Sequence, residues 1–149
     1  PEERVEGAVF PASLGAADIT EIEFITTSFD KSDGGTIQAR VRFNEPVVVN
    51  TSGGTPHLAV TNGNQGSGSG RGPHNLTYAS GTGTNELVFS LTIGAANAAT
   101  NADDVLTIGA NALALNSGTI KDVATSTTNA TITNSSAIGT AAGSITVTA

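Results

Sequence analysis

The sequence predicts an all-β domain built as an antiparallel sandwich. From residue 36 to residue 43, apolar side chains alternate with polar ones, and this period of two places one face of a strand against a core. Pro46 ends the run because it has no N–H to give to a ladder, and the alternation resumes at Val47. Half-buried strands joined by sharp corners are typical of antiparallel sheets rather than parallel ones. A second stripe with the same period consists of Leu87, Phe89, Leu91 and Ile93.

The two stripes predict where the core lies. Only five Phe and one Tyr supply aromatic rings, so an apolar core in this chain has to be mainly aliphatic. We expect the two stripes to be paired with each other in one sandwich core. The side chains expected to be buried are Ile37, Val41, Phe43, Leu87, Phe89 and Leu91.

Short strand-like segments continue along the chain, separated by turn sequences rich in Gly, Asn, Ser and Thr. Strands spaced about 8–12 residues apart are typical of a sandwich or barrel. The only window that permits a helix is 94–104, whose small residues suit a loop or a single turn. The expected strands are 18–27, 36–43, 47–50, 57–61, 76–80, 86–93, 105–108, 112–115, 119–121, 130–133 and 144–148.

A length of 149 residues fits a single domain. Residues 1–17 read neither as a strand nor as a helix, and we interpret them as an N-terminal arm. Residues 18–133 form the predicted sandwich. Residues 134–149, rich in Ala, Ser and Thr, are expected to form an edge strand or a tail.

Charge and composition exclude several classes of partner. Thirteen acidic residues against six basic ones give a formal net charge of −7. Nucleic acids and anionic lipids both attract clustered Lys and Arg, so neither is expected as a partner. No run approaches the ~20 apolar residues that a membrane-spanning helix needs. The chain has no cysteine, which excludes disulfides, thiolate zinc sites and cysteine nucleophiles.

The N-terminal residues give an expectation about the compartment. They are acidic and lack the apolar stretch of a signal peptide. Initiator methionine is commonly removed before a small residue such as Pro1, which predicts a cytoplasmic start. Cleavage of a signal sequence or excision from a longer chain would leave a similar end.

No catalytic constellation is recognisable. His57 and His74 each follow a proline in a turn-like context, where a solvated side chain is commoner than a catalyst. The segment 66–70 reads G-S-G-S-G, with glycine where a nucleophile elbow needs serine. Neither a dinucleotide-binding fingerprint nor a phosphate-binding P-loop occurs. The sequence therefore predicts a protein that is not an enzyme and needs no cofactor.

Two acidic pairs are candidates for a calcium site. Asp30 and Asp33 lie in one loop, and Asp103 and Asp104 lie in another. Calcium takes six to eight oxygen ligands, which Asp and Asn in loops supply, although neither loop matches an EF-hand. Asp and Asn also favour turns by bonding their own backbone, so the same residues equally suit ordinary turns.

The N-terminal arm is the predicted interface. Its apolar side chains are unusual for a solvated tail, while its proline and glycines disfavour a long regular element. Either the arm is a disordered or locally packed terminus, or it docks on another subunit. The residues expected to make that contact are Val5, Val9, Phe10 and Leu14.

The order of motifs from residue 35 to about residue 122 resembles an immunoglobulin-like repeat. Such repeats occur in large bacterial surface adhesins and in phage structural proteins. The matching segments are VRFNEPVVV (41–49), GGTPHLAV (53–60), LTYASGTGTNELVFSLTI (76–93), DDVLTI (103–108) and ALALNSGTIKD (112–122). The resemblance implies a seven- or eight-stranded immunoglobulin-like sandwich used for scaffolding and attachment, and it implies no enzyme.

Two departures from the adhesin pattern favour the phage proteins. Adhesin repeats come as tandem arrays in long secreted chains, whereas this chain has a single copy and an arm without an export signal. The resemblance therefore implies a capsid decoration or cement protein on the virion surface, assembled in the host cytoplasm. Its expected partners are the major capsid protein or another virion protein and further copies of itself. The alternative is a domain of a bacterial adhesin or filament at the cell surface.

Overall fold

Strands make up almost all of the regular structure, so the fold class is all-β, as the alternating pattern predicts. The computed structural model describes residues 15–64, 72–97 and 99–149. Helix α1 (Ser136–Ala141) is the one helix among them. The strands are β1 (Ile19–Phe24), β2 (Phe29–Asp30), β3 (Gly35–Phe43), β4 (Val47–Asn50), β5 (His57–Asn64), β6 (His74–Ser80), β7 (Glu86–Ile93), β8 (Asp104–Thr107), β9 (Leu113–Ala114), β10 (Thr119–Asp122) and β11 (Ile145–Thr148).

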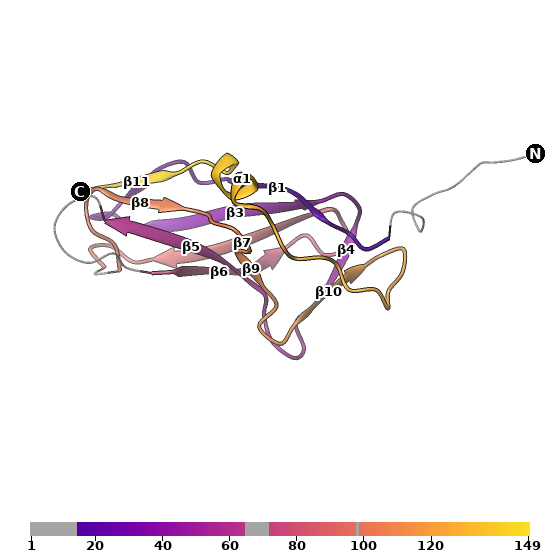
Figure 1. Ribbon diagram of the computed structural model, residues 1–149. Coiled ribbons are helices and arrows are strands. Elements are labelled where there is room, and N and C mark those ends of the chain that lie inside the picture. The colour runs from indigo at the N-terminus through magenta and orange to yellow at the C-terminus, as the bar shows by residue number, and fades with distance from the viewer. Residues whose placement is uncertain (1–14, 65–71, 98) are drawn as a thin grey trace, which may run out of the picture.

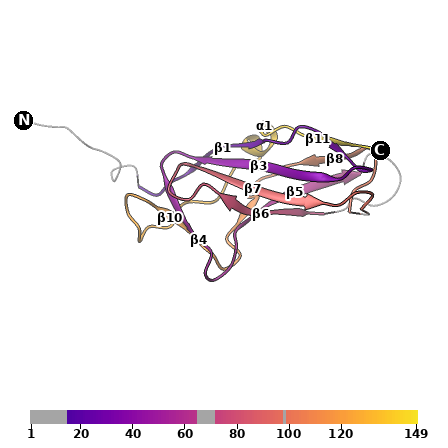
Figure 2. The same ribbon diagram turned by 180° about the vertical axis from the view of Figure 1, so that it is seen from behind.

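Nine strands belong to one curled sheet, in the order β1-β3-β7-β6-β5-β8-β11-β2, with β9 also paired to β5. The first half of β5 pairs with β6 and its second half pairs with β8, so this strand joins two halves of the sheet. Neighbouring strands are antiparallel except β11 and β2. The strands run along the long direction of the molecule (Figure 1), and β3, β7, β6 and β5 lie side by side in the opposite view (Figure 2).

Strands β4 and β10 form a separate two-stranded sheet at the end of the molecule away from the C-terminus (Figure 1). The corner at Asn44, Glu45 and Pro46 turns the chain out of β3 and into this sheet. The second edge of β4 is bonded to the turn before β7, because the Val47 N–H donates to the Thr84 carbonyl at 2.9 Å. The β4–β10 sheet is thus anchored to the larger sheet.

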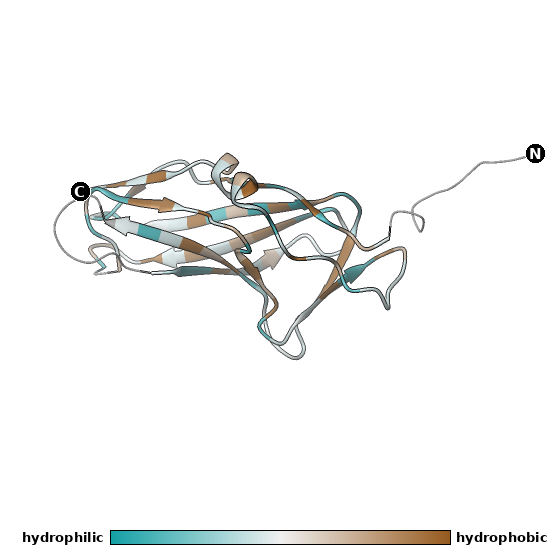
Figure 3. Cartoon of the chain, in the orientation of Figure 1, coloured by the Kyte–Doolittle hydropathy of each residue, from teal (hydrophilic) through white to brown (hydrophobic). Residues whose placement is uncertain are grey.

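The buried core follows the predicted stripes, and brown and teal alternate along the strands in Figure 3. Five of the six expected core side chains are at most 1% exposed, which confirms them: Ile37, Val41, Phe43, Leu87 and Phe89. The prediction for Leu91 was wrong, since this side chain is only half-buried. It lies beyond Ser90, the last residue of β7 that pairs with β6, so one side of it is less covered.

The polar side chains of the alternating pattern lie on the outer face of β1, β3 and β7, where they form ion pairs. Arg40 donates to a carboxylate oxygen of Glu23, with 2.6 Å between Nη2 and Oε1. Arg42 forms ion pairs with both Glu21 and Glu86, and its Nη1 lies 2.9 Å from Glu21 Oε1. The hydrogen bond and charge of Arg42 lower the pKa of Glu86. Exposed ion pairs contribute about 0–1 kcal/mol each, so this face specifies strand orientation more than it stabilises the fold.

The chain after residue 121 differs most from expectation. The expected strand 130–133 is reduced to an isolated bridge between Asp18 and Thr131. The next segment forms α1, begun by the Ser135 hydroxyl, which accepts the Ile138 N–H at 3.2 Å. Strand β11 is not an edge strand, because it lies between β8 and β2. The described residues of the window 94–104 form turns and the start of β8, in agreement with the expected loop or single turn.

Candidate functional site

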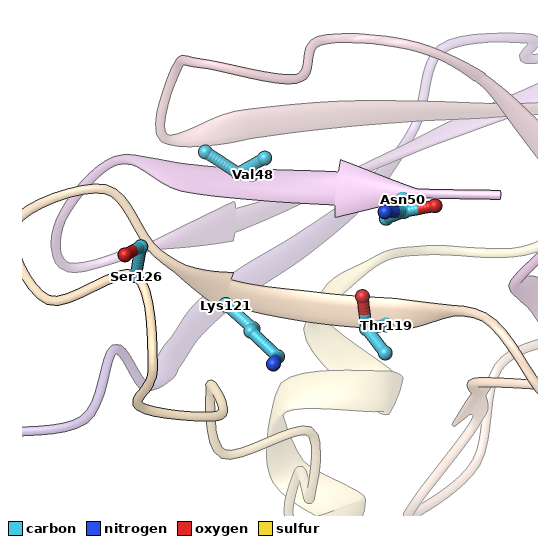
Figure 4. A pocket seen from close by; sticks show the side chains of 5 residues that line it. All are labelled: Val48, Asn50, Thr119, Lys121 and Ser126. Carbon is cyan, nitrogen blue, oxygen red and sulfur yellow. The ribbon is translucent and has the colours of Figure 1, made fainter. Parts of the chain in front are cut away.

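The outer face of the β4–β10 sheet carries the clearest candidate for a contact surface. A pocket of about 230 Å³ there is lined by Val48 and Asn50 of β4, Thr119 and Lys121 of β10, and Ser126 of the following turn (Figure 4). Val48 lies opposite Lys121 in the strand pairing. The lining thus combines one basic side chain, Lys121, and one apolar side chain, Val48, with three neutral polar ones. We call this surface the β4–β10 face.

Exposed apolar side chains gather at the same place. Three large hydrophobic side chains are exposed among the described residues, and two of them, Val48 and Val123, belong to this region. Val48 is 41% exposed and Val123 is 45% exposed. Val123 directly follows β10, and its N–H donates to the Pro46 carbonyl at 3.1 Å, which fixes it beside β4. The two valines extend the β4–β10 face with apolar area.

The described chain begins next to this face. The Ala17 N–H donates to Asp122 Oδ1 at 2.9 Å, and the Ala17 carbonyl accepts from the Thr131 N–H at 2.7 Å. Ala17 is fully buried, so the last residue of the expected arm belongs to the packed domain. The predicted interface residues Val5, Val9, Phe10 and Leu14 lie outside the described residues.

Asp30 and Asp33 occupy a turn rather than a shaped cation site. Asp30 Oδ1 accepts from the Ser32 N–H at 2.8 Å and from the Ser32 hydroxyl at 2.6 Å. These hydrogen bonds lower the pKa of Asp30. Asp33 is exposed. This geometry is that of an aspartate stabilising its own turn.

Asp103 and Asp104 do not act as a pair. Asp103 is exposed and has a φ of 71°, whereas Asp104 is fully buried. Asp104 Oδ2 accepts from Asn62 Nδ2 at 3.0 Å and from the Asn101 N–H at 2.8 Å. Among residues 15–64, 72–97 and 99–149, no three His, Asp or Glu side chains form a group that could hold a metal ion by themselves.

The two histidines lie in neighbouring strands of the larger sheet, β5 and β6. His57 is half-buried in β5. His74 is buried in β6, and its Nε2 lies 3.0 Å from Asn62 Nδ2. Since the Asn62 amide stands between His74 and Asp104, the histidine lacks the direct carboxylate partner of a catalytic triad. Burial lowers the pKa of His74, and the negative charge of Asp104 offsets part of this effect.

The lowered pKa of His74 predicts a pH dependence of stability. The unfolded chain binds a proton at this histidine more readily than the folded chain does, so stability falls as the pH drops through about 6.5, the ordinary histidine range. We expect His74→Gln to remove this component. Urea unfolding at pH 7.5 and pH 5.5 measures it. Equal losses of stability between these pH values in both proteins would contradict the assignment.

Two buried acids, Glu45 and Asp122, are not among the residues that the sequence analysis singles out. Glu45 is 4% exposed, and neither of its carboxyl oxygens has a hydrogen-bond partner. The signal was present in the alternation, since Glu45 continues the buried positions of Val41 and Phe43. Its surroundings are analysed below.

Comparisons with known proteins found no relative of this chain. No family model matches the chain, and no curated protein or solved structure matches it either. Among the described residues, no helix has the length and apolar character needed to cross a bilayer.

Proposed function

We propose that this chain is a non-enzymatic structural protein of a phage virion. In this proposal it decorates the capsid and stabilises the head through contacts with the major capsid protein or another virion protein, and with further copies of itself. Cement proteins of this kind act by burying surface across the seams between subunits. The proposal rests on the fold, on the β4–β10 face and on the position where the arm joins the domain.

Strand order supports an immunoglobulin-like reading of the fold. An immunoglobulin constant-type sandwich has strands A, B, E and D in one sheet and C, F and G in the other. We letter seven of the strands A to G in chain order: β1, β3, β5, β6, β7, β8 and β11. Strands β2, β4, β9 and β10 receive no letter. The sequence β1-β3-β7-β6 then corresponds to A-B-E-D, and β5-β8-β11 corresponds to C-F-G. Adhesin repeats would share this order, so strand order alone does not separate the two functions.

The observation that carries the proposal is the juxtaposition of the arm's attachment point with the β4–β10 face. Ala17 is bonded to Asp122, and Asp122 precedes the exposed Val123. In this proposal a neighbouring subunit binds the arm and also contacts the surface that displays Val48, Val123 and Lys121. Each large apolar side chain that such a subunit buries contributes roughly 1.5–3 kcal/mol.

Removing the arm tests this function. We expect deletion of residues 1–14 to leave the domain folded, because Ala17 and its hydrogen bonds are retained. We expect the same deletion to abolish binding to particles of the source phage, measured by co-sedimentation. A double substitution of Val48→Ser and Val123→Ser, both at exposed positions, is expected to weaken binding without changing the melting temperature.

The outcomes separate the competing functions. A truncated protein that binds particles as tightly as the full chain would refute a role for the arm between subunits. An unfolded truncated protein would show that the arm belongs to the core. Neighbouring genes for capsid and portal proteins support the virion role, whereas secretion genes and tandem copies of the domain support the adhesin.

A further inference from the structure

Glu45 is a buried acid whose carboxyl group has no hydrogen-bond partner among the described residues. It is 4% exposed, and both carboxyl oxygens are buried without a hydrogen-bond partner. An ionised carboxylate removed from water costs several kcal/mol unless it is paired, so a buried acid in a native protein has a hydrogen bond, a countercharge or a cation, or it takes up a proton. The residues that the structure describes supply no such partner for Glu45.

A second buried acid, Asp122, lies in the same corner. Asp122 ends β10 opposite Val47 and is 1% exposed. One of its oxygens, Oδ1, accepts the Ala17 N–H at 2.9 Å, which turns the carboxylate inward toward the start of β1. The backbone hydrogen bond from Val123 to Pro46 holds the end of β10 against the corner.

Asp18 brings a third carboxylate to the edge of this corner. Its N–H donates to Asn44 Oδ1 at 2.9 Å, and its carbonyl accepts the Asn44 N–H at 2.9 Å. The residues on both sides of Glu45 are thus bonded to residues that bear, or directly adjoin, the other two acids. Burial raises the pKa of Glu45, and the negative charges of Asp122 and Asp18 raise it further.

We propose that Glu45 and Asp122 bind a calcium ion in this corner, with Asp18 adding negative charge from the exposed side. Calcium takes six to eight oxygens in a flexible geometry and accepts one carboxylate through both oxygens. Magnesium demands near-ideal octahedral geometry and keeps most of its water, which suits a buried glutamate less well. Since two carboxylates do not complete the coordination, main-chain carbonyls and water supply the remaining ligands. This site is independent of the proposed function.

The site is shallow enough for an ion to reach. The residues next to Glu45 in the chain, Asn44 and Pro46, are exposed, and so are Asp18 and Val123, which are bonded to them. A cation here would link the start of β1, the β3–β4 corner and the end of β10. It would thereby stabilise the part of the domain from which the arm departs.

Calcium titration of the full-length protein tests the proposal. After treatment with EDTA, we expect cooperative unfolding to persist, because the apolar core is complete without the ion. Added calcium is expected to raise the melting temperature progressively and to give a binding isotherm by calorimetry. Glu45→Gln should lower the calcium affinity by at least about tenfold. At a pH where Glu45 is ionised, the same substitution should raise the melting temperature in EDTA, since it removes a negative charge beside Asp122 and Asp18.

Two further variants keep the test decisive. Asp122→Asn retains an acceptor for the Ala17 N–H and should also lower calcium affinity, whereas Asp33→Asn removes an exposed charge elsewhere and should change nothing. The absence of calcium binding by the unmodified protein would overturn the site and leave Glu45 as a neutral carboxylic acid. Unchanged calcium affinity in both Glu45→Gln and Asp122→Asn, or magnesium bound as tightly as calcium, would also overturn it.

Discussion

Phe89→Ala is expected to destabilise the domain by about 3–5 kcal/mol, the usual cost of removing a large buried side chain and leaving a cavity. Phe89 is fully buried at the centre of the sheet, opposite Ala39 of β3. On its other side it lies opposite Tyr78 of β6, and the ring centroids are 6.1 Å apart in an edge-on arrangement. The substitution loses the burial of the ring and this aromatic contact together. Urea unfolding followed by circular dichroism measures the change.

Thr92→Val on the same strand is the matched control. Thr92 is exposed, and valine keeps its β-branched shape but loses the 2.9 Å hydrogen bond with the Thr36 hydroxyl, so we expect a cost of at most about 1 kcal/mol. If Phe89→Ala proved no more costly than Thr92→Val, the assignment of Phe89 to the core would be wrong.

Gly81→Ala is expected to cost about 3 kcal/mol or more, because two separate penalties add. Gly81 has a φ of 115°, a backbone conformation that side chains rarely adopt. A Cβ at this position would overlap the Glu86 carbonyl oxygen and approach the Leu87 Cα within 2.9 Å. The turn between β6 and β7 would have to open, which disturbs the start of a central strand. Thermal unfolding of the variant measures the effect.

Gly83→Ala in the same turn separates the two penalties. Gly83 also has a positive φ, of 90°, but a Cβ there has no neighbour within 4 Å. We expect this variant to cost about 1–2 kcal/mol, the backbone penalty alone. Equal destabilisation by the two variants would show that the close approach at Gly81 has no energetic consequence.

Strands with a long and regular alternation were predictable from sequence. The expected bounds of β4 and β7 match the structure, and β3 begins one residue earlier than expected. The sequence of each of these segments is enough to predict a strand, because one face of the segment is apolar and a turn residue ends it. The core they form was predictable for the same reason, except at Leu91, where burial depends on how far the neighbouring strand extends.

Elements that depend on tertiary contacts were not predictable. Strand β2 has two residues, Phe29 and Asp30, and it exists because β11 lies beside it. Helix α1 consists of small and polar residues around Ile138, with Gly139 packed against the end of β8, and its position is set by the Ser135 cap. Local propensity in such short segments is weaker than the contacts that surround them.

The candidate sites also differ in whether local sequence or tertiary contacts determine them. Acidic residues in loops pointed to Asp30, Asp33, Asp103 and Asp104. In the described geometry Asp30 stabilises its own turn, and one oxygen of Asp104, Oδ2, accepts two amide hydrogen bonds. Glu45 was predictable as a buried position from its place in the alternation. Its proximity to Asp122, 77 residues later, follows only from the pairing of β4 with β10.

Localisation of the protein in the assembled particle tests the proposed function most directly. Cryo-electron microscopy of virions from the source phage is expected to show density for this all-β domain on the capsid surface, at the seams between capsid subunits. The β4–β10 face and the residues before Gly15 are expected to contact the neighbouring subunit. Absence of the protein from purified virions, together with its detection on the surface of bacterial cells, would contradict the proposal and favour the adhesin.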